Sequence, residues 1–187
     1  DFLDYETPQR FALLLGNPPY VKKSLLKQSQ LETARRIHEK EGLSEVSVKN
    51  IWTTFLIKSN TLLAANGLLA FVLPAELLQV KFAEEVREYL KREFERIEIF
   101  TFNDLMFECK GQDTIVLFAY KKALQKGEFF ANIKSKDELE TANFRLMNNN
   151  LLVDSKIKWT HHFLTSDELN FLDDLKSRLK TVNHYTH

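Results

Sequence analysis

Four consecutive residues, Asn17, Pro18, Pro19 and Tyr20, carry the groups in this chain that are best arranged for chemistry. The two prolines lack backbone N–H donors and fix φ, so the segment is a rigid turn that ends any strand before it. Asn17 offers an amide carbonyl, Pro18 offers a backbone carbonyl, and Tyr20 offers a flat aromatic face. This set can bind a planar ring that carries an amino group, with the two carbonyls accepting the amino hydrogens.

The position of the tetrapeptide favours a site over a simple turn. It follows the apolar run Phe11–Leu15, which we expect to be a buried strand. Open α/β sheets build their sites beyond the carboxyl ends of their strands. Asn and Pro are also common turn residues, so a purely structural turn is the alternative interpretation.

The segment 15–20, with the sequence LGNPPY, resembles the signature of the S-adenosylmethionine-dependent amino-methyltransferases that modify adenine in DNA. It is similar in particular to the modification enzymes of bacterial restriction systems. The resemblance implies S-adenosylmethionine as the cofactor and double-stranded DNA as the partner. It also implies methyl transfer to the N6 atom of an adenine that has been rotated out of the duplex, with Asn17, Pro18 and Tyr20 as the catalytic residues.

The same resemblance assigns roles to four further residues. Pro19 and Phe107 are expected to bind the substrate, with Phe107 stacking on the target base opposite Tyr20. Asp1 and Phe2 are expected to bind the cofactor. A carboxylate is a good acceptor for the amino group of the cofactor's adenine, and the neighbouring phenyl ring can cover the adenine face.

The rest of the chain predicts an α/β fold. We expect a partial Rossmann-like methyltransferase fold that contains the C-terminal half of the sheet and an antiparallel last strand, followed by a mixed helical extension. The division falls at 1–125 for the catalytic part and 126–187 for the extension, which leads toward a target-recognition domain. The periodicity of apolar residues predicts helices at 31–39, 48–66, 81–94 and from 165 or 166 onward, and Gly67 is the expected C-terminal stop of the helix 48–66. The predicted strands are 11–15, 67–74, 97–102, 113–120 and a segment near 129–133.

Composition limits the partners and the compartment. Lys and Arg number 26, as do Asp and Glu, so the chain has no overall basic field for nucleic acid. A local excess lies between residues 21 and 49, where seven basic residues face four acidic ones, and it can follow a DNA backbone or form an ordinary solvated face. The single Cys109 and the lack of a long apolar run predict a cytoplasmic protein with no membrane partner. The five histidines show no metal-ligand spacing, so no metal site is expected.

Two features of the resembled family are not found in this sequence. One is the glycine-rich turn that holds the methionine end of the cofactor, and the other is the acidic residue that binds its ribose. Since the first residue is Asp1 rather than Met, we expect a piece of a longer protein, in which an endonuclease or specificity domain can also reside. We therefore expect these 187 residues alone to bind the cofactor weakly and not to turn over.

Two other functions remain open from the sequence. The corner suits any planar amide or amino group, so a protein-glutamine or RNA amino-methyltransferase is one alternative. A non-catalytic DNA-binding or specificity subunit with the same fold is the other.

Overall fold

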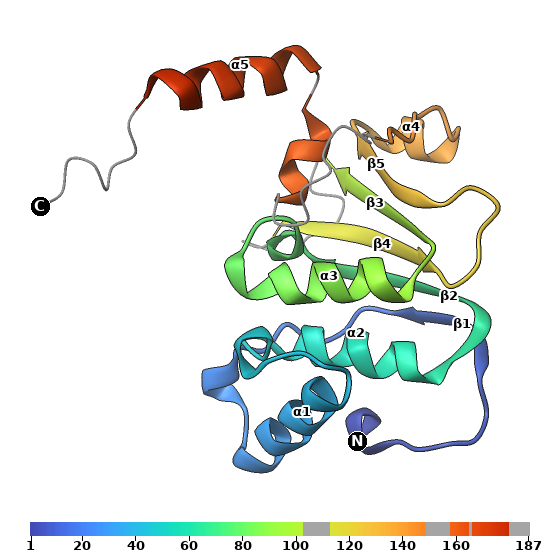
Figure 1. The fold of residues 1–187 in the computed structure, drawn as a ribbon. Helices are drawn as coiled ribbons and strands as arrows, with labels where there is room; N and C mark the ends of the chain where they lie inside the picture. Colours follow the sequence, from blue (N-terminus) through green and yellow to red (C-terminus); the bar gives the residue numbers. More distant parts are fainter. Residues whose placement is uncertain (103–112, 149–157, 165, 180–187) are drawn as a thin grey trace, which may run out of the picture.

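The computed structural model describes residues 1–102, 113–148, 158–164 and 166–179 (Figure 1). The expected substrate residue Phe107 lies outside these ranges. The strands are β1 Phe11–Gly16, β2 Leu63–Pro74, β3 Arg96–Phe102, β4 Thr114–Tyr120 and β5 Gly127–Ile133, and the α-helices are α1 Gln28–Lys40, α2 Ile51–Leu62, α3 Glu84–Glu93, α4 Lys136–Glu140 and α5 Ser166–Arg178. Short 3₁₀ helices are η1 Phe2–Asp4, η2 Lys23–Leu25, η3 Glu45–Ser47, η4 Ala75–Leu78, η5 Lys81–Ala83 and η6 Trp159–Phe163.

The strands form one mixed sheet in the order β1-β2-β4-β3-β5. β1 and β2 are parallel, and β4 is antiparallel to both of its neighbours, β2 and β3. This arrangement confirms the predicted α/β class and the predicted antiparallel strand near 113–120. β5, which comes from the segment assigned to the extension, pairs parallel to β3, so the sheet continues past residue 125.

Helices α2 and α3 cover one face of the sheet, and α1 packs on the outer side of α2 (Figure 1). The strands alternate, with residues such as Leu69, Phe71 and Leu73 of β2 pointing into this core. They meet fully buried side chains of the helices, including Trp52 and Leu90. Because each such side chain contributes about 1.5–3 kcal/mol when buried, this core holds the Asn17–Tyr20 corner in a fixed frame.

β1 differs from the buried strand that its apolar run predicts. It stands at one edge of the sheet, beside β2. Leu13 and Leu15 are 48% and 71% exposed. Successive side chains of a strand point to opposite faces of the sheet, and Leu14 packs against the core on the helix-covered face, whereas Leu13 and Leu15 point to the other face. The apolar run predicts a strand, but it does not show that both faces of that strand are covered.

One predicted boundary is wrong. The helix expected to run to Asn66 and stop at Gly67 ends at Leu62, and Leu63 already has extended backbone. Positive φ occurs at Gly42 and Gly127 rather than at Gly67. A Cβ at Gly67 would lie 3.0 Å from the carbonyl oxygen of Phe11 and 3.1 Å from that of Ala64. Gly67 therefore allows two backbones to approach closely where the β1–β2 register shifts, and it does not cap a helix.

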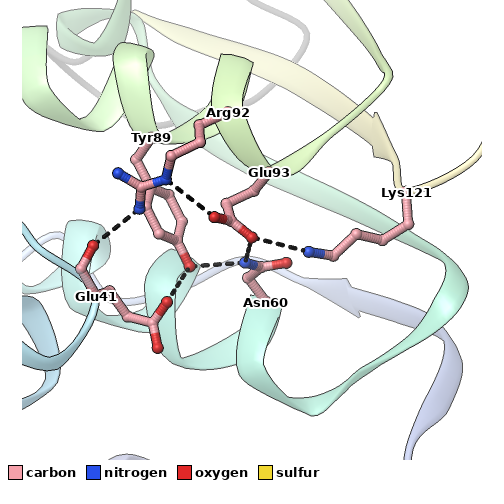
Figure 2. A network of polar contacts seen from close by, with 6 residues as sticks. All are labelled: Glu41, Asn60, Tyr89, Arg92, Glu93 and Lys121. Atoms are coloured by element: carbon pink, nitrogen blue, oxygen red, sulfur yellow. Dashed lines mark hydrogen bonds and ion pairs between the residues drawn. The ribbon is translucent and has the colours of Figure 1, made fainter.

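The end of the sheet opposite the corner is closed by a polar network (Figure 2). Asn60 of α2 donates to the Tyr89 hydroxyl at 2.7 Å, and burial raises the pKa of Tyr89. The Glu93 carboxylate of α3 accepts a hydrogen bond from Nζ of Lys121 at 3.2 Å, and the Arg92 guanidinium donates to the backbone carbonyl of Glu41 at 2.8 Å. These contacts join the end of α1, α2, α3 and the residue after β4, so they stabilise the helical layer away from the site.

The part of the chain that the structure describes contains no helix long and apolar enough to cross a membrane.

Candidate active site

The Asn17–Tyr20 corner stands where β1 ends. Gly16 is the last residue of β1 and pairs with Phe71 of β2, so the corner begins at the carboxyl end of two parallel strands. Asn17 and Pro19 are exposed, Pro18 is buried and Tyr20 is half-buried. The Tyr20 hydroxyl donates to the carbonyl oxygen of Val72 at 3.0 Å, which ties the end of the corner to β2.

Gly16 is required by the close approach of β1 to the Phe71 ring. A Cβ at position 16 would lie 2.9 Å from Cε1 of Phe71 and 3.3 Å from two further ring atoms. Real carbon contacts lie at about 3.5–4.0 Å, so a larger residue here would displace the ring. The glycine before Asn17 thus sets how closely the aromatic wall of the site comes to the corner.

A hollow of about 300 Å³ opens beside the corner. Its lining is uncharged, and it consists of Phe2, Leu14, Leu15, Gly16, Asn17, Pro18, Pro19, Phe55, Ser59 and Phe71. Phe55 and Ser59 are four residues apart on α2, so they share one face of that helix. Small-molecule sites are concave, mostly apolar and supplied with a few polar groups, and this hollow has that composition.

The Phe2 and Phe55 rings are stacked, with centroids 5.2 Å apart and planes at 13°. This contact holds the 3₁₀ helix η1 against α2 and places Phe2 in the wall of the hollow. Asp1 lies outside the lining, is exposed, and accepts a hydrogen bond from the backbone N–H of Leu3 at 3.2 Å. Its carboxylate therefore caps η1.

The structure thus brings four of the predicted site residues together. Phe2, Asn17, Pro18 and Pro19 line one hollow, although Phe2 is fifteen positions before Asn17 in the sequence. Tyr20 follows at the base of the corner, with its hydroxyl engaged by β2.

Sequence reasoning missed Gly16, Phe55, Ser59 and Phe71 as members of the site. The signal for Phe55 and Ser59 was their spacing on one helix, but nothing in that spacing says which face of the sheet the helix covers.

Metal ligands are not gathered at this site. Over the described ranges, no group of three or more His, Cys, Asp or Glu side chains is placed to hold a metal ion. His38 lies elsewhere in a buried position, where its ring nitrogens contact the hydroxyls of Ser47 at 2.7 Å and Thr54 at 3.0 Å. Burial lowers the pKa of His38 to about 4, so the ring is neutral at physiological pH.

The hollow fits the adenosine part of S-adenosylmethionine. Three phenyl rings and Pro19 offer flat apolar contacts for a purine, and the Ser59 hydroxyl and the Asn17 amide supply polar groups. The methionine end would need the glycine-rich turn, which this sequence does not contain. The residues present therefore fit one part of the cofactor.

The parallel pair β1–β2, the antiparallel β4 and the corner at the end of β1 define a domain of the S-adenosylmethionine-dependent methyltransferase fold. Solved structures of other proteins share this fold, and two of them illustrate it. One is the type I restriction-modification methyltransferase subunit from Streptococcus thermophilus, with a TM-score of 0.60, 19% identity, and coverage of 86% of this chain and 40% of that chain. The other is a Listeria monocytogenes protein assigned as a class I S-adenosylmethionine-dependent methyltransferase, with a TM-score of 0.55, 15% identity, and coverage of 84% of this chain and 45% of that chain.

The chain belongs to the Eco57I restriction-modification methylase family, whose model matches residues 1–107. The match includes β1, the corner, α2 and β2. The chain is also similar to the type II methyltransferase M.AccI of Acinetobacter calcoaceticus, with 23% identity over 194 residues that cover 99% of this chain. It spans 32% of the length of M.AccI.

Proposed function

We propose that this chain supplies part of the catalytic domain of an adenine-N6 DNA methyltransferase of a restriction-modification system. The observation that carries the proposal is the Asn17–Tyr20 corner, which stands at the carboxyl end of β1 and shares one hollow with Phe2 and Phe55. Membership of the Eco57I family supports the methyltransferase class. The amino-group substrate follows from the chemistry of the corner.

Two acceptors at the corner act on the target amino group. The lone pair of the adenine amino nitrogen is delocalised into the ring, which makes that nitrogen a poor nucleophile. When Oδ1 of Asn17 and the carbonyl oxygen of Pro18 accept its two hydrogens, the nitrogen moves toward tetrahedral geometry and its lone pair becomes available. As positive charge develops on nitrogen, both acceptors bind it more strongly, so they stabilise the transition state more than the ground state.

When bound, S-adenosylmethionine would supply a methyl group whose bond to the positively charged sulfur breaks as the bond to the amino nitrogen forms, leaving a neutral thioether. The methylated nitrogen would then release one of its two protons to solvent. The chain's own contribution on that side is the aromatic wall of Phe2, Phe55 and Phe71, which orients the adenosine part. Asn17 is exposed in the unliganded site, so the uncharged lining would lower the local dielectric and strengthen the hydrogen bonds at Asn17 only once the bound cofactor and base exclude water. One carboxylate oxygen of Asp1 accepts from the N–H of Leu3, so the other is the candidate acceptor for the cofactor's amino group.

Tyr20 and Phe107 are assigned to the target base in this proposal. The Tyr20 ring is half-buried and its hydroxyl is fixed to Val72, so the ring has a set orientation for stacking. Stacking on aromatic side chains offsets part of the few kcal/mol that base flipping requires.

The test is methyl transfer from labelled S-adenosylmethionine to unmethylated duplex DNA by the full-length protein in which this chain occurs. We expect label at adenine N6 and a kcat that is roughly 10²–10³-fold lower for Asn17→Ala, because that variant lacks one of the two acceptors that stabilise the transition state. Asn17→Asp keeps an acceptor oxygen and should retain more activity than Asn17→Ala. Asn66→Ala, at an exposed asparagine at the other end of the sheet, is the matched control and should retain full activity.

Other outcomes would redirect the proposal. Label on glutamine or RNA instead of DNA would keep the chemistry and refute the DNA substrate. An Asn17→Ala protein that is folded and fully active would refute the corner as catalytic. The isolated chain of 187 residues should bind S-adenosylmethionine more weakly than the full-length protein and show no turnover.

A further inference from the structure

A second hollow, of about 700 Å³, lies directly beyond the corner. Its basic residues are Lys22, Lys23 and Lys49, and its lining also includes Asn50 and Glu76. Apolar walls come from Leu26, Leu31 and Phe82. None of these residues lines the hollow that contains Asn17, so this is a separate feature of the surface.

Backbone hydrogen bonds hold the residues that line this hollow next to the corner. The N–H of Ile51, the first residue of α2, donates to the carbonyl of Val21 at 2.9 Å, and Val21 directly follows Tyr20. The N–H of Lys23 donates to the carbonyl of Lys49, also at 2.9 Å. The segment after the corner and the start of α2 are therefore held side by side, with the positive end of the α2 dipole at the hollow.

Asn50 is the unusual member of the lining. Its side chain is 4% exposed, and its Oδ1 atom is buried without a hydrogen-bond partner among the described residues. Asn50 precedes α2 as its N-cap, yet its side chain makes no capping hydrogen bond. A buried polar group without a partner is unfavourable, and a carboxamide can present either its oxygen or its NH₂ by rotation. Because Oδ1 is covered and can only accept, the NH₂ group of the same carboxamide is the donor that an anion in the hollow would use.

The charges favour an anion. Lys23 is paired with Glu45 at 2.5 Å, whereas Lys22 and Lys49 are exposed and have no ion pair within the described part of the chain. Glu76 offsets part of this charge, and the N-terminal end of α2 adds to it. An anion alone would leave the Leu26, Leu31 and Phe82 walls unused, so the best fit is a phosphate joined to an apolar body.

We propose that this hollow binds a sugar-phosphate group of the DNA strand beside the target adenine, with the phosphate on Lys22 and Lys49 and the deoxyribose against the apolar walls. The inference rests on the proposed function for its choice of DNA over a free nucleotide. The fixed link between Val21 and Ile51 places such a contact next to the base held at the corner. This subsite would hold the backbone in place while the base is turned out.

The experiment measures binding of a fluorescently labelled duplex by the full-length protein at several salt concentrations, beside steady-state methylation. For the double variant Lys22→Gln, Lys49→Gln we expect Kd and the KM for DNA to rise roughly tenfold at physiological salt, with kcat unchanged. The slope of log Kd against log salt should fall by about 0.9 for each phosphate that the variant no longer binds. The double variant Lys134→Gln, Lys158→Gln removes the same charge from exposed lysines outside the basic segment 21–49 and should leave both values unchanged.

Two further variants separate a ligand contact from a structural role. Glu76→Gln should tighten DNA binding roughly two- to fivefold, an effect that damage to the fold cannot produce. Asn50→Ala should weaken DNA binding without lowering the melting temperature, because it removes an oxygen that has no partner among the described residues.

The outcomes distinguish this inference from the proposed function. If duplex binding depends on Lys22 and Lys49 but no adenine is methylated, the subsite stands and the proposed function fails. If DNA is methylated and the lysine variant behaves like its control, the subsite is refuted. If deoxyadenosine monophosphate or inorganic phosphate displaces the duplex from the wild type at micromolar concentration, the hollow binds free anions, and the assignment to DNA is overturned.

Discussion

Replacing Gly16 with alanine tests how closely the site is built against the sheet. The new Cβ would stand 2.9 Å from Cε1 of Phe71, whereas carbon contacts ordinarily begin near about 3.5 Å. The ring must therefore move by roughly half an ångström or more, and Phe71 is 5% exposed with core residues around it. Overpacking of this kind costs about 1–3 kcal/mol.

For a folding unit of about this size, that destabilisation corresponds to a fall of roughly 2–12 °C in the melting temperature of the transition in which this unit unfolds. The open side available to the ring is the hollow that Phe71 lines with Asn17 and Phe55, so the affinity for S-adenosylmethionine should fall as well. Thermal melting and calorimetric titration of the full-length protein measure the two effects.

A double-mutant cycle with Phe71→Leu gives the decisive result. Leucine removes the ring atoms that the new Cβ meets, so Gly16→Ala should cost much less in the Phe71→Leu background than in the wild type. A coupling energy near zero, or a Gly16→Ala protein that melts like the wild type, would refute the close packing of β1 against Phe71 as the reason for glycine.

Three further predictions concern the corner, the aromatic wall and acid stability. Tyr20→Phe keeps the ring and removes the hydrogen bond to Val72, so kcat should fall less than tenfold, while Tyr20→Ala should remove most activity; equal losses in the methylation assay would contradict a stacking role. Phe55→Ala should raise the KM for S-adenosylmethionine and leave the KM for DNA unchanged, and the reverse pattern would contradict the cofactor assignment of the smaller hollow. Burial lowers the pKa of His38 from 6.5 to about 4, so the unfolded state binds a proton before the folded state does as the pH falls. The contribution of neutral His38 to the free energy of unfolding is therefore fully present above about pH 6.5 and is lost toward pH 4. The loss from His38 is about 2 kcal/mol at about pH 5, and urea unfolding of His38→Gln should show a smaller pH dependence than the wild type; an identical dependence would contradict it.

The sequence determined the chemistry of the corner. Asn17, Pro18 and Tyr20 lie within four consecutive residues, and the properties of proline and of the amide are local, so the turn that presents them is set by the sequence itself. The same holds for the apolar run that became β1 and for the amphipathic pattern that became α3, because these patterns report the type of element that a segment forms. Burial is a different matter, since Leu15 is exposed on the face of β1 opposite the one by which Leu14 packs against the core.

Tertiary structure decided which distant residues join the corner. Phe55 and Phe71 reach the smaller hollow because α2 packs on β2 and β2 pairs with β1, and spacing along the chain does not encode either choice. The end of α2 at Leu62 is another example, since residues 63–66 were expected in the helix and pairing with β1 draws Leu63 into a strand. Likewise, Lys22 and Lys49 meet because backbone hydrogen bonds tie the segment after the corner to the start of α2. Local residue types thus set the reactive groups, and long-range backbone pairing set the walls around them.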